Sequence, residues 1–193
     1  MAPGTEDERQ KMLKVPYREA VGMLMFAACV SRPDVMYAVS VVSRYSADPG
    51  QAHWTAVKKI ICYLRDTVEY NIVYDGSNAE GLKIYSDSDY AADPDTRRSR
   101  SGYVATLAGG AVSWSSEMQP VVALSTTEAE YVAACGASKE AIWLRRLLKS
   151  VGVRLSSATK MYLDNQGSIK LIRNPEFHKR TKHIAVPLHS RSS

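Results

Sequence analysis

Apolar residues recur at helical spacing through the first 75 residues of the chain. Three stretches, 15–30, 31–50 and 51–67, each place apolar side chains on one side of a helix. In the third stretch that side consists of Trp54, Val57, Ile61 and Leu64. Turn residues such as the Pro49-Gly50 pair separate the stretches. The pattern predicts three helices that bury one another as a small bundle.

The apolar period changes to two after the turn-rich segment GSNAEG, so a domain boundary is expected between residues 75 and 76. Just before it, YNIVYD predicts a short strand. Beyond it, LKIYSD predicts one strand, and GYVATLAGGAVSWSS predicts two more strands around a hairpin turn at Gly109-Gly110. These three strands are expected to be consecutive and antiparallel.

A long helix is expected next, in STTEAEYVAACGASKEAIWLRRLLKSVG. Ser125, Thr126 or Thr127 can cap its start, and Gly152 follows its end. KMYLDN then predicts a fourth strand and QGSIKLIRN a short helix. The expected fold class is therefore α/β, with a mixed sheet at 76–193 preceded by a small helical segment at 1–75.

Charge is distributed unevenly between these two parts. The net charge is +5, and residues 1–75 contribute nine basic and nine acidic residues against sixteen and eleven in residues 76–193. The second part would therefore attract a polyanion such as nucleic acid. Residues 170–191 hold six basic residues and the single acid Glu176, which is equally typical of a solvated tail.

No apolar run is long enough to span a bilayer, and the amino-terminal segment is charged where a signal peptide would be apolar. We therefore expect an intracellular protein with no membrane partner. The isolated cysteines Cys29, Cys62 and Cys135 are expected to be buried thiols. The aromatic residues of the first part are expected in its core; they are Tyr17, Phe26, Tyr37, Tyr45, Trp54 and Tyr63.

Acidic residues follow the first and fourth expected strands and begin the long helix. Asp87 and Asp164 lie at the two strand ends, and Glu128 and Glu130 lie in the first turn of the helix. If the two strands are neighbours, a carboxylate cluster forms at one sheet edge, where it needs a cation such as Mg²⁺. Turn formation and the helix dipole are local alternatives that explain the same acids without a metal.

Five segments match a known protein family in their residues and not only in their spacing: YSDSDYAADPDTRRSRSGYV, GGAVSWSSEMQPVVALSTTEAEYVAA, KEAIWLRRLL, YLDNQGSI and FHKRTKHI. They resemble the ribonuclease H region of copia-type LTR-retrotransposon Pol polyproteins, which are abundant in plants. The helical part resembles the connection segment between the reverse transcriptase and that region. The resemblance implies an RNase H-like fold that uses two Mg²⁺ ions, or Mn²⁺ as a substitute, to cleave the RNA strand of RNA·DNA hybrids.

The resemblance also implies roles for individual residues. Asp87 would be the metal-bridging carboxylate, and Asp164 in YLDNQ the ligand from the fourth strand. Glu130 is preferred over Glu128 as the helix ligand because it begins the EYVA segment, while Asp89 remains a turn or outer group. The three expected catalytic and metal-binding residues are thus Asp87, Glu130 and Asp164.

Basic and hydroxyl side chains that precede the second strand are expected to contact the hybrid, with a solvent-exposed turn as the alternative. They are Arg97, Arg98, Ser99 and Ser101. Contact there would depend on phosphates and duplex shape rather than base sequence.

The chain departs from the family in two ways. It has no YVDD-type polymerase motif, so DNA synthesis is not expected. It reads TKHIAVPLHSRSS where the family continues TKHIDVRYHFIRE, so the fifth strand and last helix, with a fourth metal-binding Asp, are expected to be missing. His178 and His183 are expected to be surface or packing residues rather than ligands.

Two functions from different classes therefore remain open at this point. The first is an RNase H-like nuclease that associates with other Pol-derived polypeptides. The second is a catalytically dead or domesticated fragment that binds nucleic acid or a partner without cleavage. Neither the nucleus nor a cytoplasmic particle is favoured as the location.

Overall fold

The structure, a computed structural model, describes residues 5–77, 81–153, 155 and 157–173 of the chain. The chain divides into two compact units, Met1–Ile72 and Val73–Ser193. Each unit has a hydrophobic core of its own. This division lies close to the boundary expected after residue 75.

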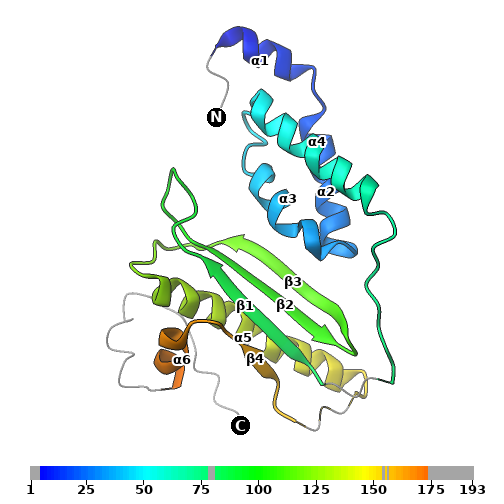
Figure 1. The fold of residues 1–193 in the computed structure, drawn as a ribbon, viewed down its shortest axis with the longest axis vertical. Helices are drawn as coiled ribbons and strands as arrows, with labels where there is room; N and C mark the ends of the chain where they lie inside the picture. Colours follow the sequence, from blue (N-terminus) through cyan, green and yellow to red (C-terminus); the bar gives the residue numbers. More distant parts are fainter. Residues whose placement is uncertain (1–4, 78–80, 154, 156, 174–193) are drawn as a thin grey trace. The chain divides into compact units, whose positions relative to one another are not determined.

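The regular elements in the described part of the first unit are all helical (Figure 1). Its elements are α1 (Glu6–Leu13), α2 (Tyr17–Val30), the 3-10 turn η1 (Pro33–Val35), α3 (Met36–Ser43) and α4 (Gln51–Asp66). Helices α2, α3 and α4 pack on one another around Val39 and Val57, both fully buried. The Tyr17 hydroxyl donates a hydrogen bond to the Val42 carbonyl at 2.8 Å, which ties α2 to α3.

The three expected helices are present, and the structure adds α1, which the apolar pattern did not predict. Its start has a local signal: the Thr5 hydroxyl accepts a hydrogen bond from the N–H of Glu8, three residues later, and acids fill the first turn. Ser31 is the residue at which α2 ends. On α4 the buried side includes Ile60 instead of Ile61, which is exposed.

Several expected core residues of the first unit are exposed. Phe26 is 71% exposed, Tyr37 52% and Tyr63 42%, so the expectation that all its aromatic residues lie in the core was wrong for these three. Cys29 and Cys62 are likewise exposed, and only Cys135 of the second unit is buried. The helices are apolar on more than one side, and packing covers only the side that faces the other two helices. Burial raises the pKa of the Cys135 thiol to about 11.

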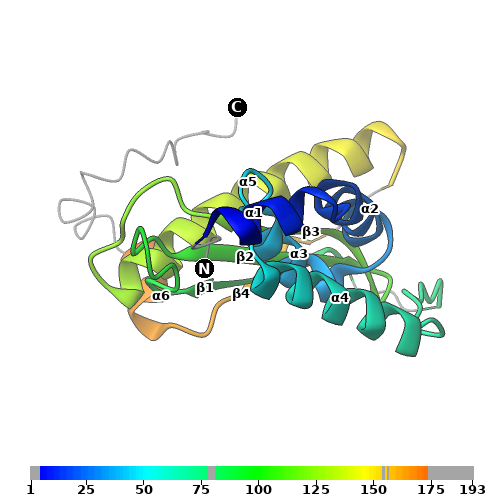
Figure 2. The same ribbon diagram turned by 90° about the horizontal axis from the view of Figure 1, so that it is seen from above.

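The second unit is an α/β arrangement around a mixed sheet (Figures 1 and 2). Its elements are β1 (Lys83–Asp89), β2 (Arg100–Leu107), β3 (Gly110–Met118), α5 (Thr126–Ser150), β4 (Lys160–Tyr162) and α6 (Gln166–Arg173). The strand order is β3-β2-β1-β4. Strands β1, β2 and β3 are antiparallel neighbours, as the sequence pattern predicted. Strand β4 pairs with β1 in parallel, which meets the condition set above for a carboxylate cluster at one sheet edge.

Helix α5 lies along one face of this sheet (Figures 1 and 2). Ile84 and Ala105, paired across β1 and β2, are fully buried under it, and Ala137 and Leu144 pack from the helix side. Ser125 caps the helix by accepting a hydrogen bond from the N–H of Glu128 at 3.2 Å. The sheet and helix thus follow the alternation and the cap signals of the sequence.

Two local predictions were wrong. Residues 70–75 form no strand, because they reach only the end of the β2–β3 hairpin, where the Asp75 N–H donates to the Ala108 carbonyl. The hairpin turn lies at Ala108-Gly109, both at positive φ, and not at Gly109-Gly110. Gly110 already pairs with Leu107, and a Cβ there would lie 2.5 Å from the Tyr74 ring.

Within the described part of the chain, no helix is long and apolar enough to cross a membrane.

Candidate metal centre

The parallel pairing of β1 and β4 brings two carboxylates to one sheet edge. Tyr85 pairs with Tyr162, and Asp87 and Asp164 each follow their tyrosine by two residues. Because the strands run in the same direction, both side chains reach the carboxyl-terminal edge of the sheet. Both aspartates are exposed there.

Helix α5 supplies a third carboxylate from beneath the sheet. Oε1 of Glu130 accepts hydrogen bonds from the backbone N–H of Ser88 at 3.1 Å and from its hydroxyl at 2.8 Å. Ser88 follows Asp87 directly, so these bonds tie the helix acid to the strand acid. Glu130 is only 6% exposed, although it carries an ionisable group.

One carboxylate oxygen from each of Asp87, Glu130 and Asp164 lies within 4.8 Å of the other two. Burial raises the pKa of Glu130 above its ordinary value, and the nearby charges of Asp87 and Asp164 raise it further, while the hydrogen bonds from Ser88 oppose both effects. Three acids this close repel one another unless a cation or a proton lies between them.

The second carboxylate oxygen of Glu130 indicates whether a cation or a proton suits this site better. Oε2 is buried and has no hydrogen-bond partner among the residues that the structure describes. A buried carboxylate oxygen without a donor is costly, and a hard divalent cation with oxygen ligands would satisfy it. The residues present therefore fit Mg²⁺ or Mn²⁺, with the exposed aspartates open to further ligands.

The neighbouring acids lie outside this cluster. Oε2 of Glu128 accepts a hydrogen bond from the Leu124 N–H at 2.7 Å and helps to fix the loop that enters α5. Asp89 lies at the end of β1 and is exposed. Of the two helix acids that the sequence left open, the structure brings Glu130 to the aspartates.

The loop between β1 and β2 carries the predicted nucleic-acid contacts. Arg97 and Arg98 are exposed, and Arg97 has a positive φ of 55°. Ser99 is fully buried and its hydroxyl accepts a hydrogen bond from the Ala91 N–H at 3.0 Å, so the expectation of direct contact was wrong for this residue. Half-buried Ser101 accepts a hydrogen bond from the Gln119 side chain.

Asp93 organises this loop, a role that the sequence reasoning missed. Its side chain is buried and accepts hydrogen bonds from the N–H and the hydroxyl of Thr96, while its own N–H donates to the Arg98 carbonyl. The signal was available, since Asp followed by Pro and then Thr three residues on is typical of a side-chain-capped turn. The loop thus holds the two arginines on an ordered turn.

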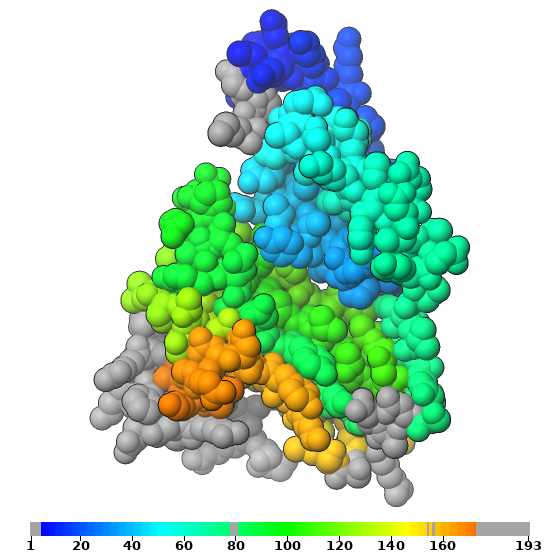
Figure 3. Space-filling model, in the orientation of Figure 1, coloured from blue at the N-terminus to red at the C-terminus, as the bar shows by residue number. Residues whose placement is uncertain are grey.

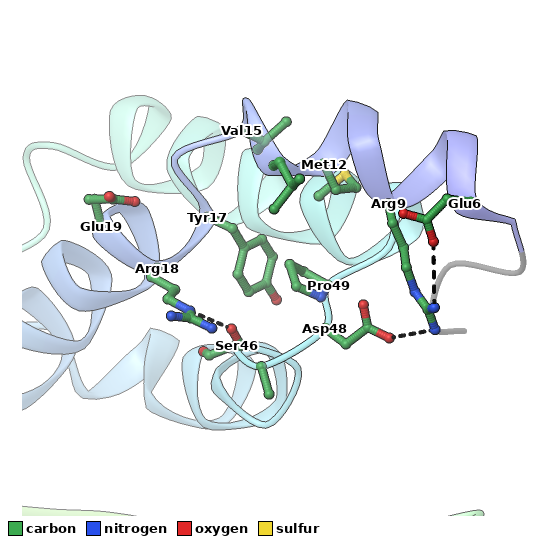
Figure 4. Close-up of a pocket in the computed structure, with 12 residues that line it drawn as sticks. Glu6, Arg9, Met12, Val15, Tyr17, Arg18, Glu19, Ser46, Asp48 and Pro49 are labelled. Carbon is green, nitrogen blue, oxygen red and sulfur yellow. Dashed lines mark hydrogen bonds and ion pairs between the residues drawn. The ribbon is translucent and has the colours of Figure 1, made fainter.

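The helical unit contains a cleft of about 470 Å³ between α1, the start of α2 and the segment before α4 (Figure 4). In this cleft Arg9 lies 3.5 Å from Asp48 and 3.9 Å from Glu6, and Arg18 donates to the Ser46 carbonyl (Figure 4). This cleft holds no metal-ligating cluster among the residues described there. His178 and His183, considered above, lie outside the described residues.

The mixed sheet and the carboxylate cluster define an α/β protein with a candidate centre for divalent metal ions. The chain belongs to the family of copia-type LTR-retrotransposon Pol polyproteins. It is 49% identical, over 98% of its length, to a retrovirus-related Pol polyprotein from transposon TNT 1-94 of Nicotiana tabacum. It is 41% identical, over 90% of its length, to the corresponding polyprotein from transposon RE2 of Arabidopsis thaliana.

The chain spans only 14% and 12% of these two polyproteins. It also resembles a shorter protein, secreted RxLR effector protein 161 of Plasmopara viticola, with 46% identity over 69% of this chain and 94% of that protein. No protein-family profile matches the chain, and no solved structure matches it.

Proposed function

We propose that the second unit is an RNase H-like domain that hydrolyses the RNA strand of RNA·DNA hybrids with two divalent metal ions. The observation that carries this proposal is the convergence of Asp87, Glu130 and Asp164 from three separate elements to within 4.8 Å. Membership in the Pol polyprotein family supports a substrate of nucleic acid.

The topology supports the RNase H-like assignment. Three consecutive antiparallel strands are followed by a long helix and by a fourth strand that lies parallel to the first. This order places the ends of β1 and β4 side by side above the first turns of α5. A strand-borne acid, a helix-borne acid and a second strand-borne acid then share one edge of the sheet.

Each acid has a distinct proposed role. Asp87 would bridge the two metal positions, and Glu130 and Asp164 would contribute one further ligand group each. Bound Mg²⁺, or Mn²⁺ as a substitute, supplies an activated water and stabilises the leaving oxygen of a phosphodiester. Hydrolysis in line at phosphorus would leave a 3′-hydroxyl and a 5′-phosphate.

The protein's own groups would position the substrate. Arg97 and Arg98 would contact phosphates of the hybrid from the ordered loop that Asp93 holds, without reading base sequence. Because the curated polyproteins are far longer than this chain, association with other Pol-derived polypeptides is part of the proposal.

The experiment is cleavage of an end-labelled RNA·DNA hybrid with and without Mg²⁺, for the natural chain and for Asp87→Asn. We expect hybrid-specific, Mg²⁺-dependent products from the natural chain. The cleavage rate of the variant should be lower by more than about a hundred-fold, which is the size of effect seen when a transition-state contact is removed. Single-stranded RNA serves as the substrate control. Glu117→Gln is the matched variant, since this exposed carboxylate lies on β3 outside the cluster.

Thermal unfolding of each variant shows whether a loss of cleavage is a loss of folding. A folded natural chain that binds hybrid but makes no products with either metal would overturn the nuclease proposal. That result would favour the alternative, a retroelement-derived protein that binds nucleic acid without cutting it.

A further inference from the structure

A row of large side chains crosses the sheet on the face opposite α5. Tyr85 pairs with Tyr162 on one side and with Val104 on the other, and Val104 pairs with Trp114. Paired residues in a sheet project to the same face, and Ile84 and Ala105, one position away, lie under α5. These four residues, called the aromatic row below, therefore cross all the described strands on the face opposite α5; they are Tyr162, Tyr85, Val104 and Trp114.

The row is open to solvent. Tyr85 is 45% exposed and Val104 36%, which is unusual because both lie on central strands of the sheet, and Tyr162 on the edge strand β4 is 42% exposed. In Figures 1 and 3, α5 lies behind the strands, and β1 and β4 reach the surface on the viewer's side. No helix among the described residues of the second unit covers this face in Figure 1.

The two tyrosines already form a stack. Their ring centroids are 4.8 Å apart and their planes are inclined by only 13°. Since β4 is the outermost strand on that side among the residues that the structure describes, no described strand lies beside the Tyr162 ring on the side away from Tyr85. A planar ring added there would continue the stack at ordinary aromatic spacing.

Basic residues flank the stack. Lys83 pairs with Lys160 one row further along the same face, two residues before the tyrosines. Each strand rises about 3.3 Å per residue, so the ammonium groups and the rings are within reach of one nucleotide and its phosphates. On the other side of the tyrosines, the same face ends at Asp87 and the metal centre.

We propose that this face binds single-stranded nucleic acid, with bases stacked on the Tyr85–Tyr162 pair and phosphates contacted by Lys83 and Lys160. Exposed aromatic rings with flanking basic side chains on a sheet are a general solution for unpaired bases. The binding needs no metal ion and no cleavage, so it is independent of the hydrolytic function proposed above.

Charge favours this ligand over an apolar partner. A helix or a second copy of the chain that covered the row would have to desolvate two lysines, whereas a phosphate backbone would pair with them. The tyrosine hydroxyls are also better suited to a wet, partly polar ligand than to a dry interface.

The test is fluorescence anisotropy with a labelled oligothymidylate of roughly 12 nucleotides, in EDTA. We expect Tyr85→Leu combined with Tyr162→Leu to raise the Kd about ten-fold or more, because leucine keeps an apolar surface but cannot stack. The Phe pair, Tyr85→Phe with Tyr162→Phe, should bind as the natural chain does. Lys160→Gln should lower the magnitude of the salt slope by about one.

Tyr70→Leu is the matched control, because Tyr70 is 63% exposed and lies outside the sheet. Far-ultraviolet circular dichroism and thermal unfolding show that each variant is folded. Equal binding by the folded Leu pair, or no binding by the natural chain in EDTA, would overturn the proposal. So would a dimer in sedimentation that the Leu pair dissociates and the oligonucleotide does not, since the face would then be a self-association surface.

Discussion

Ser88 donates two hydrogen bonds to a single oxygen of Glu130, one from its backbone N–H at 3.1 Å and one from its hydroxyl at 2.8 Å. Ser88 lies on β1 directly after Asp87, and Glu130 lies on α5. This contact orients the helix carboxylate so that its other oxygen remains without a partner among the described residues. The relationship makes Ser88 a positioning residue for the proposed metal centre.

Replacing Ser88 by alanine removes one of the two donors. We expect Ser88→Ala to cost about 1–3 kcal/mol of stability, as for a lost bond to a charged group, and to raise the Mg²⁺ concentration needed for half-maximal cleavage. Ser86→Ala is the control, since the Ser86 hydroxyl is buried on the same strand with no partner among the described residues. Unchanged Mg²⁺ dependence in Ser88→Ala would contradict the positioning role.

Replacing Glu130 by glutamine removes a buried charge beside two aspartates. In metal-free buffer at neutral pH we expect Glu130→Gln to raise the free energy of unfolding by roughly 1 kcal/mol, because the repulsion is relieved while the amide oxygen can still accept from Ser88. Adding Mg²⁺ should raise the Tm of the natural chain and leave that of the variant nearly unchanged. Equal Mg²⁺ shifts in both would argue against a metal at this cluster.

The pair Arg32 and Asp34 in the helical unit predicts a pH dependence. Hydrogen bonds from the Arg32 guanidinium lower the pKa of Asp34 below its ordinary value. A lowered folded-state pKa stabilises the fold above the unfolded-state pKa, and this stability is lost as pH falls through the folded-state value. Asp34→Asn should therefore reduce stability near neutral pH, by less than about 1 kcal/mol, and little at strongly acidic pH.

Urea unfolding from pH 2 to pH 7 measures this difference. Asp66→Asn is the control, because Asp66 pairs with Arg65 where both side chains are largely exposed. If the free energies of unfolding of the natural chain and of Asp34→Asn changed with pH in parallel, the Arg32–Asp34 pair would contribute nothing to the pH dependence of stability.

Gly110 allows close contact between the hairpin and the segment before β1. A Cβ at this position would lie 2.5 Å from the Tyr74 ring and 2.7 Å from the Val73 carbonyl oxygen. We expect Gly110→Ala to destabilise the second unit by about 1–3 kcal/mol, as overpacking does. Gly136→Ala on α5 meets nothing within 4 Å and should stabilise by up to about 1 kcal/mol, so thermal unfolding of the two variants should shift in opposite directions.

Arg97 and Arg98 are expected to contact phosphates rather than bases. Substituting each by glutamine should weaken hybrid binding equally for different sequences and lower the magnitude of the salt slope by about one. Arg146→Gln, in the last turns of α5, is the control. Sequence-dependent losses in a titration with several hybrids would show base readout instead.

Local sequence pattern determined most of the secondary structure. The period-two alternation marked β1, β2 and β3, and the Ser125 cap and Gly152 marked the ends of α5, because these signals depend on neighbouring residues alone. The acids after the first and fourth strands could be named from the sequence, since a parallel pairing of those strands puts their ends at one edge.

Tertiary packing decided the rest. Glu130 and not Glu128 joins the aspartates because residues two apart on a helix point in nearly opposite directions, and packing of α5 on β1 selects one of them. Ser99 is buried and Phe26 exposed because each depends on what lies against it from distant parts of the chain. Local periodicity carries no information about such contacts, so the open aromatic face beside the carboxylates became visible only in the folded sheet.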